Sequence, residues 1–101
     1  MGGVLIVAKR LKEARLRFGI SQKQLGIRAE INESGASARM NQYEKAVHKP
    51  DPLMLKRLAA VLHVPVPYFY CEDAELADLN LKFSTLGKEQ RRRLLGLFHK
   101  L

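Results

Sequence analysis

The sequence contains one cysteine, and its apolar runs are short. A single cysteine, Cys71, excludes an intramolecular disulfide framework and a metal site built only from cysteines. We expect this thiol to serve as a small, half-buried apolar side chain. The apolar run at residues 4–8 is too short for a signal-peptide core or a membrane span. We therefore expect a cytoplasmic protein with no membrane partner.

The residue constellations of enzymes and metal sites are also missing. The three histidines, His48, His63 and His99, are scattered along the chain, and none has a carboxylate or cysteine at a matching spacing. The sequence has no glycine-rich loop of the kind that holds a phosphate group. We expect a protein that is not an enzyme and that uses no metal and no cofactor.

Acidic residues are few. The 101 residues include 18 Lys and Arg against 10 Asp and Glu, which gives a formal net charge of +8 at pH 7. The excess is uneven, because residues 1–70 hold 12 basic and 5 acidic residues whereas residues 71–101 hold 6 and 5. This asymmetry favours a polyanionic partner, above all a nucleic acid, for the first two thirds of the chain.

The composition, 47% hydrophobic and 28% charged, is typical of one folded globular domain with a modest core. Apolar residues recur at helical spacing, and no strand pattern or internal repeat interrupts them, so the predicted fold class is all-α. Tyr68 and Phe69 are expected to point inward from a short fifth helix. The predicted helices lie at about residues 5–18, 22–29, 34–45, 52–62, within 64–73, within 72–83 and within 84–101.

Three residue patterns mark expected helix ends. Gly19 follows the first helix as a C-cap. Ser21 precedes the second helix and forms a capping box with Gln24. Asp51 caps the fourth helix, whose first residue is Pro52.

Residues 34–45 carry few large apolar side chains and are still expected to be helical. At about 100° per residue, two sets of side chains fall on opposite faces. The inner set is Ala36, Met40 and Tyr43. The outer set is Ala38, Asn41, Gln42 and Lys45. The outer face offers amides, an ammonium group and a methyl group, which suit the edges of DNA bases and equally suit an ordinary solvated helix.

Four segments in order, RLKEAR, GISQKQLG, MNQYE and LKRLAAVLHVPVPYF, give this helix a context. Together they resemble the Cro/cI-type (XRE) helix-turn-helix family of bacterial and phage repressors over residues 10–70. The resemblance implies a five-helix lambda-repressor-like domain that reads the major groove of double-stranded DNA. The expected function is a sequence-specific transcriptional regulator, with repression favoured.

By analogy with the family, the resemblance assigns roles to individual residues. The base-reading set is Ser37, Ala38, Arg39, Asn41 and Gln42. The phosphate-binding set is Ser21, Gln22, Lys23, Lys45, His48 and Lys49. Arg15 and Glu44 occupy positions that pair in the family, and we expect a partly buried ion pair that orients the reading helix. Lys9 and Arg10 either add to the phosphate contacts or are simply solvated.

The sequence departs from the family pattern in three places. The segment between Ser21 and Met40 is about four residues longer than usual, and its Glu30 and Glu33 would be repelled by phosphate, so the longer turn should point away from DNA. Ala46 and His63 stand where relatives commonly carry glycines that end helices. We expect a strained or altered helix end, since histidine tolerates positive φ better than most residues.

The final third of the chain adds two helices beyond the family domain. We expect a division into a DNA-binding domain at residues 1–70 and a helical extension at residues 71–101. The expected dimerisation residues are Leu94, Leu95, Phe98 and Leu101. Such an apolar face either folds back on the domain or meets a partner, and a homodimer is the favoured use. The alternative function is an antitoxin-like module whose C-terminal helices bind another protein.

Overall fold

The computed structural model describes residues 2–101, and this part of the chain is helical and contains no strand. The all-α fold class predicted from the sequence is therefore confirmed. The elements in chain order are α1 (Gly2–Phe18), α2 (Gln22–Arg28), α3 (Glu33–Glu44), α4 (Pro52–Leu62), the 3-10 helix η1 (Val66–Tyr70), α5 (Ala74–Thr85) and α6 (Lys88–Phe98).

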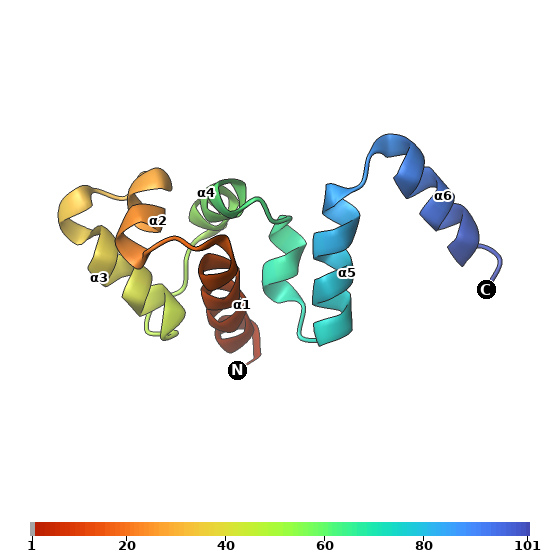
Figure 1. Cartoon of the computed structure of the whole chain (residues 1–101). Coiled ribbons are helices and arrows are strands. Elements are labelled where there is room, and N and C mark those ends of the chain that lie inside the picture. Colours follow the sequence, from red (N-terminus) through yellow and green to blue (C-terminus); the bar gives the residue numbers. More distant parts are fainter. Residues whose placement is uncertain (1) are drawn as a thin grey trace.

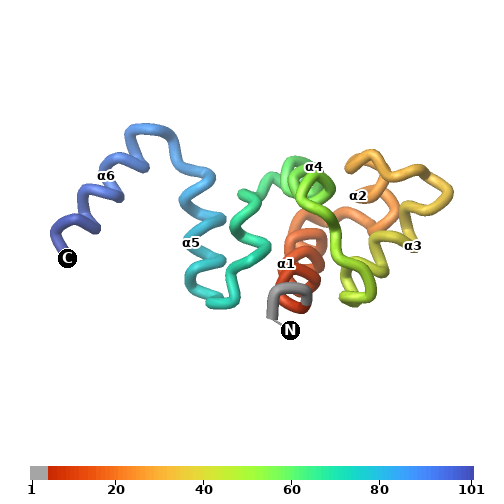
Figure 2. Tube along the Cα trace, turned by 180° about the vertical axis from the view of Figure 1, so that it is seen from behind, coloured from red at the N-terminus to blue at the C-terminus, as the bar shows by residue number. Residues whose placement is uncertain are grey.

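Most of the helices surround α1, and α5 and α6 follow one after the other toward the C-terminus (Figure 1). α1 lies between the α2–α3 pair on one side and η1 with α5 on the other. The view from behind shows the same order, with α6 apart from the other helices at the far end (Figure 2). The molecule is accordingly elongated, with extents of 51 × 29 × 22 Å.

The predicted caps define the helix ends. Gly19 has φ of 79° directly after α1, a conformation that glycine adopts without steric cost. The Ser21 hydroxyl accepts a hydrogen bond from the Gln24 amide at 3.0 Å and begins α2. The Asp51 carboxylate accepts one from the Met54 amide at 2.8 Å and begins α4. These three boundaries follow from local chemistry alone.

Two helix ends carry the backbone conformation that favours glycine without having a glycine. Ala46, beyond α3, has φ of 60°, and His63, at the end of α4, has φ of 58°. Both ends still close with hydrogen bonds, from the Val47 amide to Gln42 O at 2.9 Å and from the Val64 amide to Ala59 O at 3.1 Å. The expectation of strained ends is confirmed, since a left-handed conformation costs an L-residue about 1–2 kcal/mol.

One hydrophobic core joins most of the elements. α1 contributes Leu11, α2 Leu25 and α3 Met40, and none of these side chains is exposed. Tyr68 and Phe69 of η1 are buried in the same cluster, as the sequence predicts. The remaining members with large side chains include Val7, Ile20, Tyr43, Leu55, Leu58 and Leu62.

The core continues past residue 70. Cys71 and Ala77 belong to the same cluster, with exposures of 6% and 3%, and Leu81 packs against it. Cys71 is thus more deeply buried than the half-buried position expected from the sequence. The first part of α5 therefore helps to enclose the core that the preceding helices form.

The α2–α3 contact depends on a glycine. A Cβ atom built on Gly26 would lie 2.9 Å from the Ala36 Cβ and 3.1 Å from the Met40 Cγ. Distances below about 3 Å do not occur between relaxed carbon atoms, so only glycine permits this approach of the two helices. The small residue Ala36 on the α3 side completes the close packing.

α6 has no buried residue among its eleven. Leu95, Leu97 and Phe98 are 47%, 59% and 45% exposed. α6 itself lies beyond α5, apart from the helices around α1 (Figure 1). Among the helices that residues 2–101 form, none is both long and apolar enough to cross a membrane.

Candidate nucleic-acid interface

α3 presents the predicted base-reading residues on its outer side. Ser37, Ala38 and Arg39 are exposed, and Asn41 and Gln42 are half-buried. The inner residues Ala36, Met40 and Tyr43 are 0%, 0% and 7% exposed, so the division of this helix into two faces is confirmed. α3 therefore carries mainly polar side chains on its outer face and packs its apolar inner face into the core.

An ion pair fixes α3 to α1. The Arg15 guanidinium donates from Nε to Oε2 of Glu44 and from Nη2 to Oε1 at 3.1 Å. Its Nη1 donates to the carbonyl of Ile20 at 3.0 Å. The side chains are 12% and 3% exposed, so water screens the pair little. Two parallel hydrogen bonds restrict direction as well as distance, and they set how α3 lies across α1.

Gln22 extends this pair to the outer face of α3. Its Nε2 donates to Oε1 of Glu44 at 3.1 Å and to Oδ1 of Asn41 at 3.4 Å. A continuous path of hydrogen bonds thus runs from Arg15 through Glu44 and Gln22 to Asn41. Because the Asn41 oxygen faces Gln22, the Asn41 amide nitrogen is turned to donate elsewhere.

Gln22 was assigned to phosphate from the sequence, and its contacts with α3 were missed. Gln22 is the first residue of α2 and is half-buried against α3. Helical periodicity places a residue on a face of its own helix, and it does not identify the neighbouring helix that meets that face. The predicted N-cap at Ser21 marks the start of α2 but identifies no partner for the next side chain.

The other phosphate candidates lie at two places beside α3. Ser21 and Lys23 are exposed at the start of α2, where the Ser21 hydroxyl already accepts from Gln24. Lys45, His48 and Lys49 are exposed on the segment that follows α3. The hydrogen bonds from Gln22 to Asn41 and Glu44 hold the start of α2 next to the second half of α3. All five side chains remain accessible to a large anion.

The long turn between α2 and α3 is acidic but locally balanced. The Glu30 carboxylate lies 3.7 Å from Arg57 Nε, and the Glu33 carboxylate lies 3.8 Å from Lys23 Nζ. Both carboxylates are largely exposed, and such surface pairs contribute at most about 1 kcal/mol. Lys23 is consequently held only weakly by its carboxylate partner and can exchange it for another anion.

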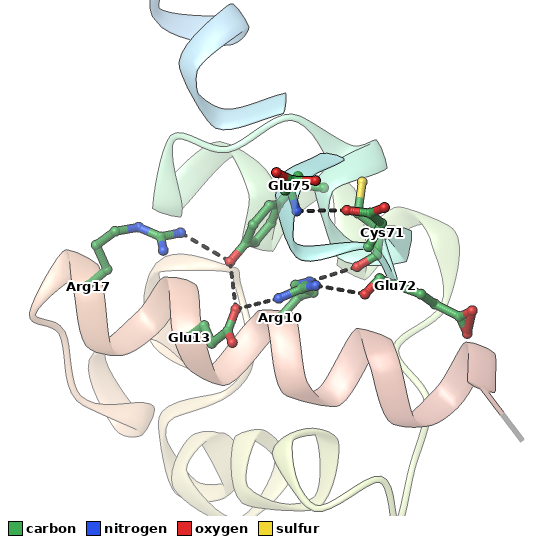
Figure 3. Close-up of polar contacts among 8 residues, drawn as sticks. Arg10, Glu13, Arg17, Cys71, Glu72 and Glu75 are labelled. Carbon is green, nitrogen blue, oxygen red and sulfur yellow. Dashed lines mark hydrogen bonds and ion pairs between the residues drawn. The ribbon is translucent and has the colours of Figure 1, made fainter. Parts of the chain in front are cut away.

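Arg10 corrects the sequence interpretation. It neither projects into solvent nor joins the polar face, because it is 4% exposed and donates to the backbone carbonyls of Cys71 and Glu72 (Figure 3). A signal was present: Arg10 stands three residues after Val7 and four before Ala14, on the apolar stripe of α1. Lys9 is exposed.

The small all-helical fold is shared with a solved regulator of transcription. The chain belongs to a family of transcriptional regulators. It is 48% identical to the transcriptional regulator BswR, whose crystal structure superposes with a TM-score of 0.88 over 93% of each chain. No family model and no curated protein matches the chain. Within residues 2–101, no group of three or more His, Cys, Asp or Glu side chains is placed to hold a metal ion.

Proposed function

We propose that the chain is a sequence-specific double-stranded DNA-binding regulator of the Cro/cI (XRE) helix-turn-helix kind, in which α3 enters the major groove. The observation that carries the proposal is the hydrogen-bonded path from Arg15 through Glu44 and Gln22 to Asn41. It fixes a polar helix face against the core before any ligand binds. A preorganised face loses little side-chain freedom on binding, which favours affinity.

The exposed groups of α3 match the chemistry of base edges. Asn41 and Gln42 carry amides, which pair with N6 and N7 of adenine, and the Ala38 methyl suits the thymine methyl. Arg39 can donate to a guanine or to a phosphate, and Ser37 to either kind of acceptor. Each good bidentate contact discriminates against a wrong base by about 1–3 kcal/mol.

Phosphates would meet the residues beside α3. The proposed set is Ser21, Lys23, Lys45, His48 and Lys49 through their side chains, and Gln22 through its backbone amide, because its side-chain amide donates to Glu44 and Asn41. The amides at the start of α2 and the helix dipole favour an anion there, and the net charge of +8 supports the same partner. Repression would follow from occupation of the operator, without an enzymatic step.

Two copies of the chain would bind together. Leu95, Phe98, Leu79 and Phe83 line an apolar groove of about 220 Å³ between α5 and α6, and Leu94, Leu95, Phe98 and Leu101 are the dimerisation residues proposed from the sequence. A second copy of α6 is the proposed occupant. A two-fold dimer would place two reading helices on half-sites about 34 Å apart. Leu79 and Phe83 of α5 were not predicted from the sequence.

Selection of binding sites from random duplexes tests the proposal with the full chain. We expect a two-fold symmetric consensus and an affinity that falls steeply with salt, by roughly 10³–10⁵ between 50 and 200 mM for about six to ten phosphate contacts. Absence of any enriched sequence contradicts the proposal. The variant Leu95→Glu should shift the sedimentation mass from dimer to monomer, whereas Lys100→Glu, at an exposed position just beyond the end of α6, should not.

The exposed apolar face of α6 also favours a second candidate, the antitoxin-like module that binds another protein. That reading predicts a monomer that occupies DNA weakly on its own. A stable dimer with a symmetric consensus excludes it.

A further inference from the structure

Arg10 connects α1 to the segment that leads into α5 (Figure 3). Its Nε donates to the carbonyl oxygen of Cys71 at 2.8 Å, and its Nη2 donates to that of Glu72 at 3.2 Å. Its Nη1 donates to Oε1 of Glu13 at 2.9 Å. Cys71 and Glu72 lie between η1 and α5, where the chain is outside any helix. The buried Arg10 guanidinium thus donates hydrogen bonds to two carbonyl oxygens of a segment that is not helical.

The same connection is held from a second side. The Tyr68 hydroxyl donates to Oε1 of Glu13 at 3.3 Å and accepts from Arg17 Nη2 at 3.1 Å. Cys71, in the connection itself, and Ala77, in the first turn of α5, are buried in the core. The join between η1 and α5 is therefore packed and hydrogen-bonded, which is unlike a flexible linker between two domains.

The join between α5 and α6 is built differently. Arg91 donates to the carbonyls of Phe83 and Ser84 at 3.2 and 3.1 Å, and its guanidinium lies 4.9 Å from the centre of the Phe83 ring. α6 adds no buried residue. The extension is thus stiff at its first join and lightly attached at its second.

We propose that Arg10 is a positioning residue that fixes the direction of α5 relative to α3 and thereby the half-site spacing that a dimer accepts. The inference rests on the proposed function, in which α5 and α6 form the dimer contact. The path from that contact to α3 then runs through α5 and α1. α5 has 12 residues and is about 18 Å long. A change of about 10° at its base moves its far end by roughly 3 Å, close to the ~3.4 Å rise of one base pair.

The test compares the full chain with Arg10→Met on duplexes in which the best half-site spacing is lengthened or shortened by one or two base pairs. Arg10→Met should remain a dimer and bind an isolated half-site as the unchanged protein does. Its preference for the best spacing should fall about tenfold or more, because the second binding event loses its fixed geometry. The matched control Arg92→Met removes an exposed arginine that pairs with Glu89 on the same helix, and should keep the preference.

A distance measurement makes the same comparison without DNA. Spin labels on Lys12→Cys in α1 and Lys82→Cys in α5, both exposed positions, should give a narrow distance distribution that Arg10→Met broadens. Where Arg10→Met does not fold, Arg10→Lys carries both measurements, because an ammonium group lacks the fork that reaches both carbonyls. If these variants keep the sharp preference for one half-site spacing and their spin-label distance distribution does not broaden, the inference about Arg10 is wrong while the proposed function stands. An unchanged protein without any spacing preference overturns it together with the proposed dimeric function.

Discussion

Replacement of Arg15 by methionine tests what holds α3 in place. The change removes two hydrogen bonds to Glu44 and one to the Ile20 carbonyl. The Glu44 side chain is 3% exposed, and its carboxylate would keep only the hydrogen bond from Gln22. Removing one partner of a buried ion pair costs about 3–5 kcal/mol. Because Arg15 is 12% exposed and water can partly replace it, we expect the lower end, about 3 kcal/mol.

Chemical and thermal unfolding measure this loss. For a domain of this size, 1 kcal/mol corresponds to about 4–8 °C in Tm, so Arg15→Met should lower Tm by roughly 12–24 °C. The double variant Arg15→Met/Glu44→Leu should recover much of the stability, since two apolar side chains leave no buried charge without a partner. Arg92→Met, an exposed arginine on α6, should stay within about 0.5 kcal/mol of the unchanged protein.

The same variants separate stability from recognition. The double variant should be stable yet bind its operator more weakly, because apolar packing does not restore the hydrogen bonds that direct Gln22 and Asn41. Additive stability losses in the double variant would refute the reasoning, since residues in contact couple by about 0.5–3 kcal/mol. So would a single variant as stable as the unchanged protein.

Substitutions elsewhere follow from the same geometry. Gln42→Ala should relax preference at one or two base pairs by about 1–3 kcal/mol each, whereas Lys49→Ala should weaken all sequences alike and lower the salt slope by about one unit. Titrations on specific and random duplexes measure both, and identical behaviour contradicts the assigned roles. Gly26→Ala should destabilise by about 1–3 kcal/mol through overpacking, and the control Gly35→Ala, with open space around its Cβ, should not destabilise in urea unfolding. Ala46→Gly should raise stability by up to about 1 kcal/mol, because relief of the left-handed strain exceeds the added chain entropy; a loss of stability would show that the strain is absent.

The sequence predicts the helix ends well because their causes are local. The side chains of Ser21 and Asp51 accept hydrogen bonds from amides three residues away, and Gly19 adopts a positive φ without steric cost at its own position. The inner face of α3 is equally predictable, because 3.6-residue periodicity places Ala36, Met40 and Tyr43 together. These features require no knowledge of the rest of the fold.

Features that depend on which faces meet could not be predicted in this way. Two of the partners of Arg10 are backbone carbonyls more than 60 residues away, and no side-chain pattern marks them. The close approach at Gly26 requires the crossing of α2 over α3 to be known. The division at residue 70 remains a prediction, and the core that continues through Cys71 to Ala77 favours a unit that includes α5.

Two arginines make α1 the element that holds both α3 and the start of α5 in place. Arg15 binds α3 through Glu44, and Arg10 binds the start of α5 through two carbonyls. They are five residues apart, which turns them by about 140° around the helix axis. They therefore reach in different directions, and α3 and α5 lie on different sides of α1 (Figure 1). Since both arginines belong to one helix, we expect α1 to set the separation between the proposed reading face and the proposed dimer contact.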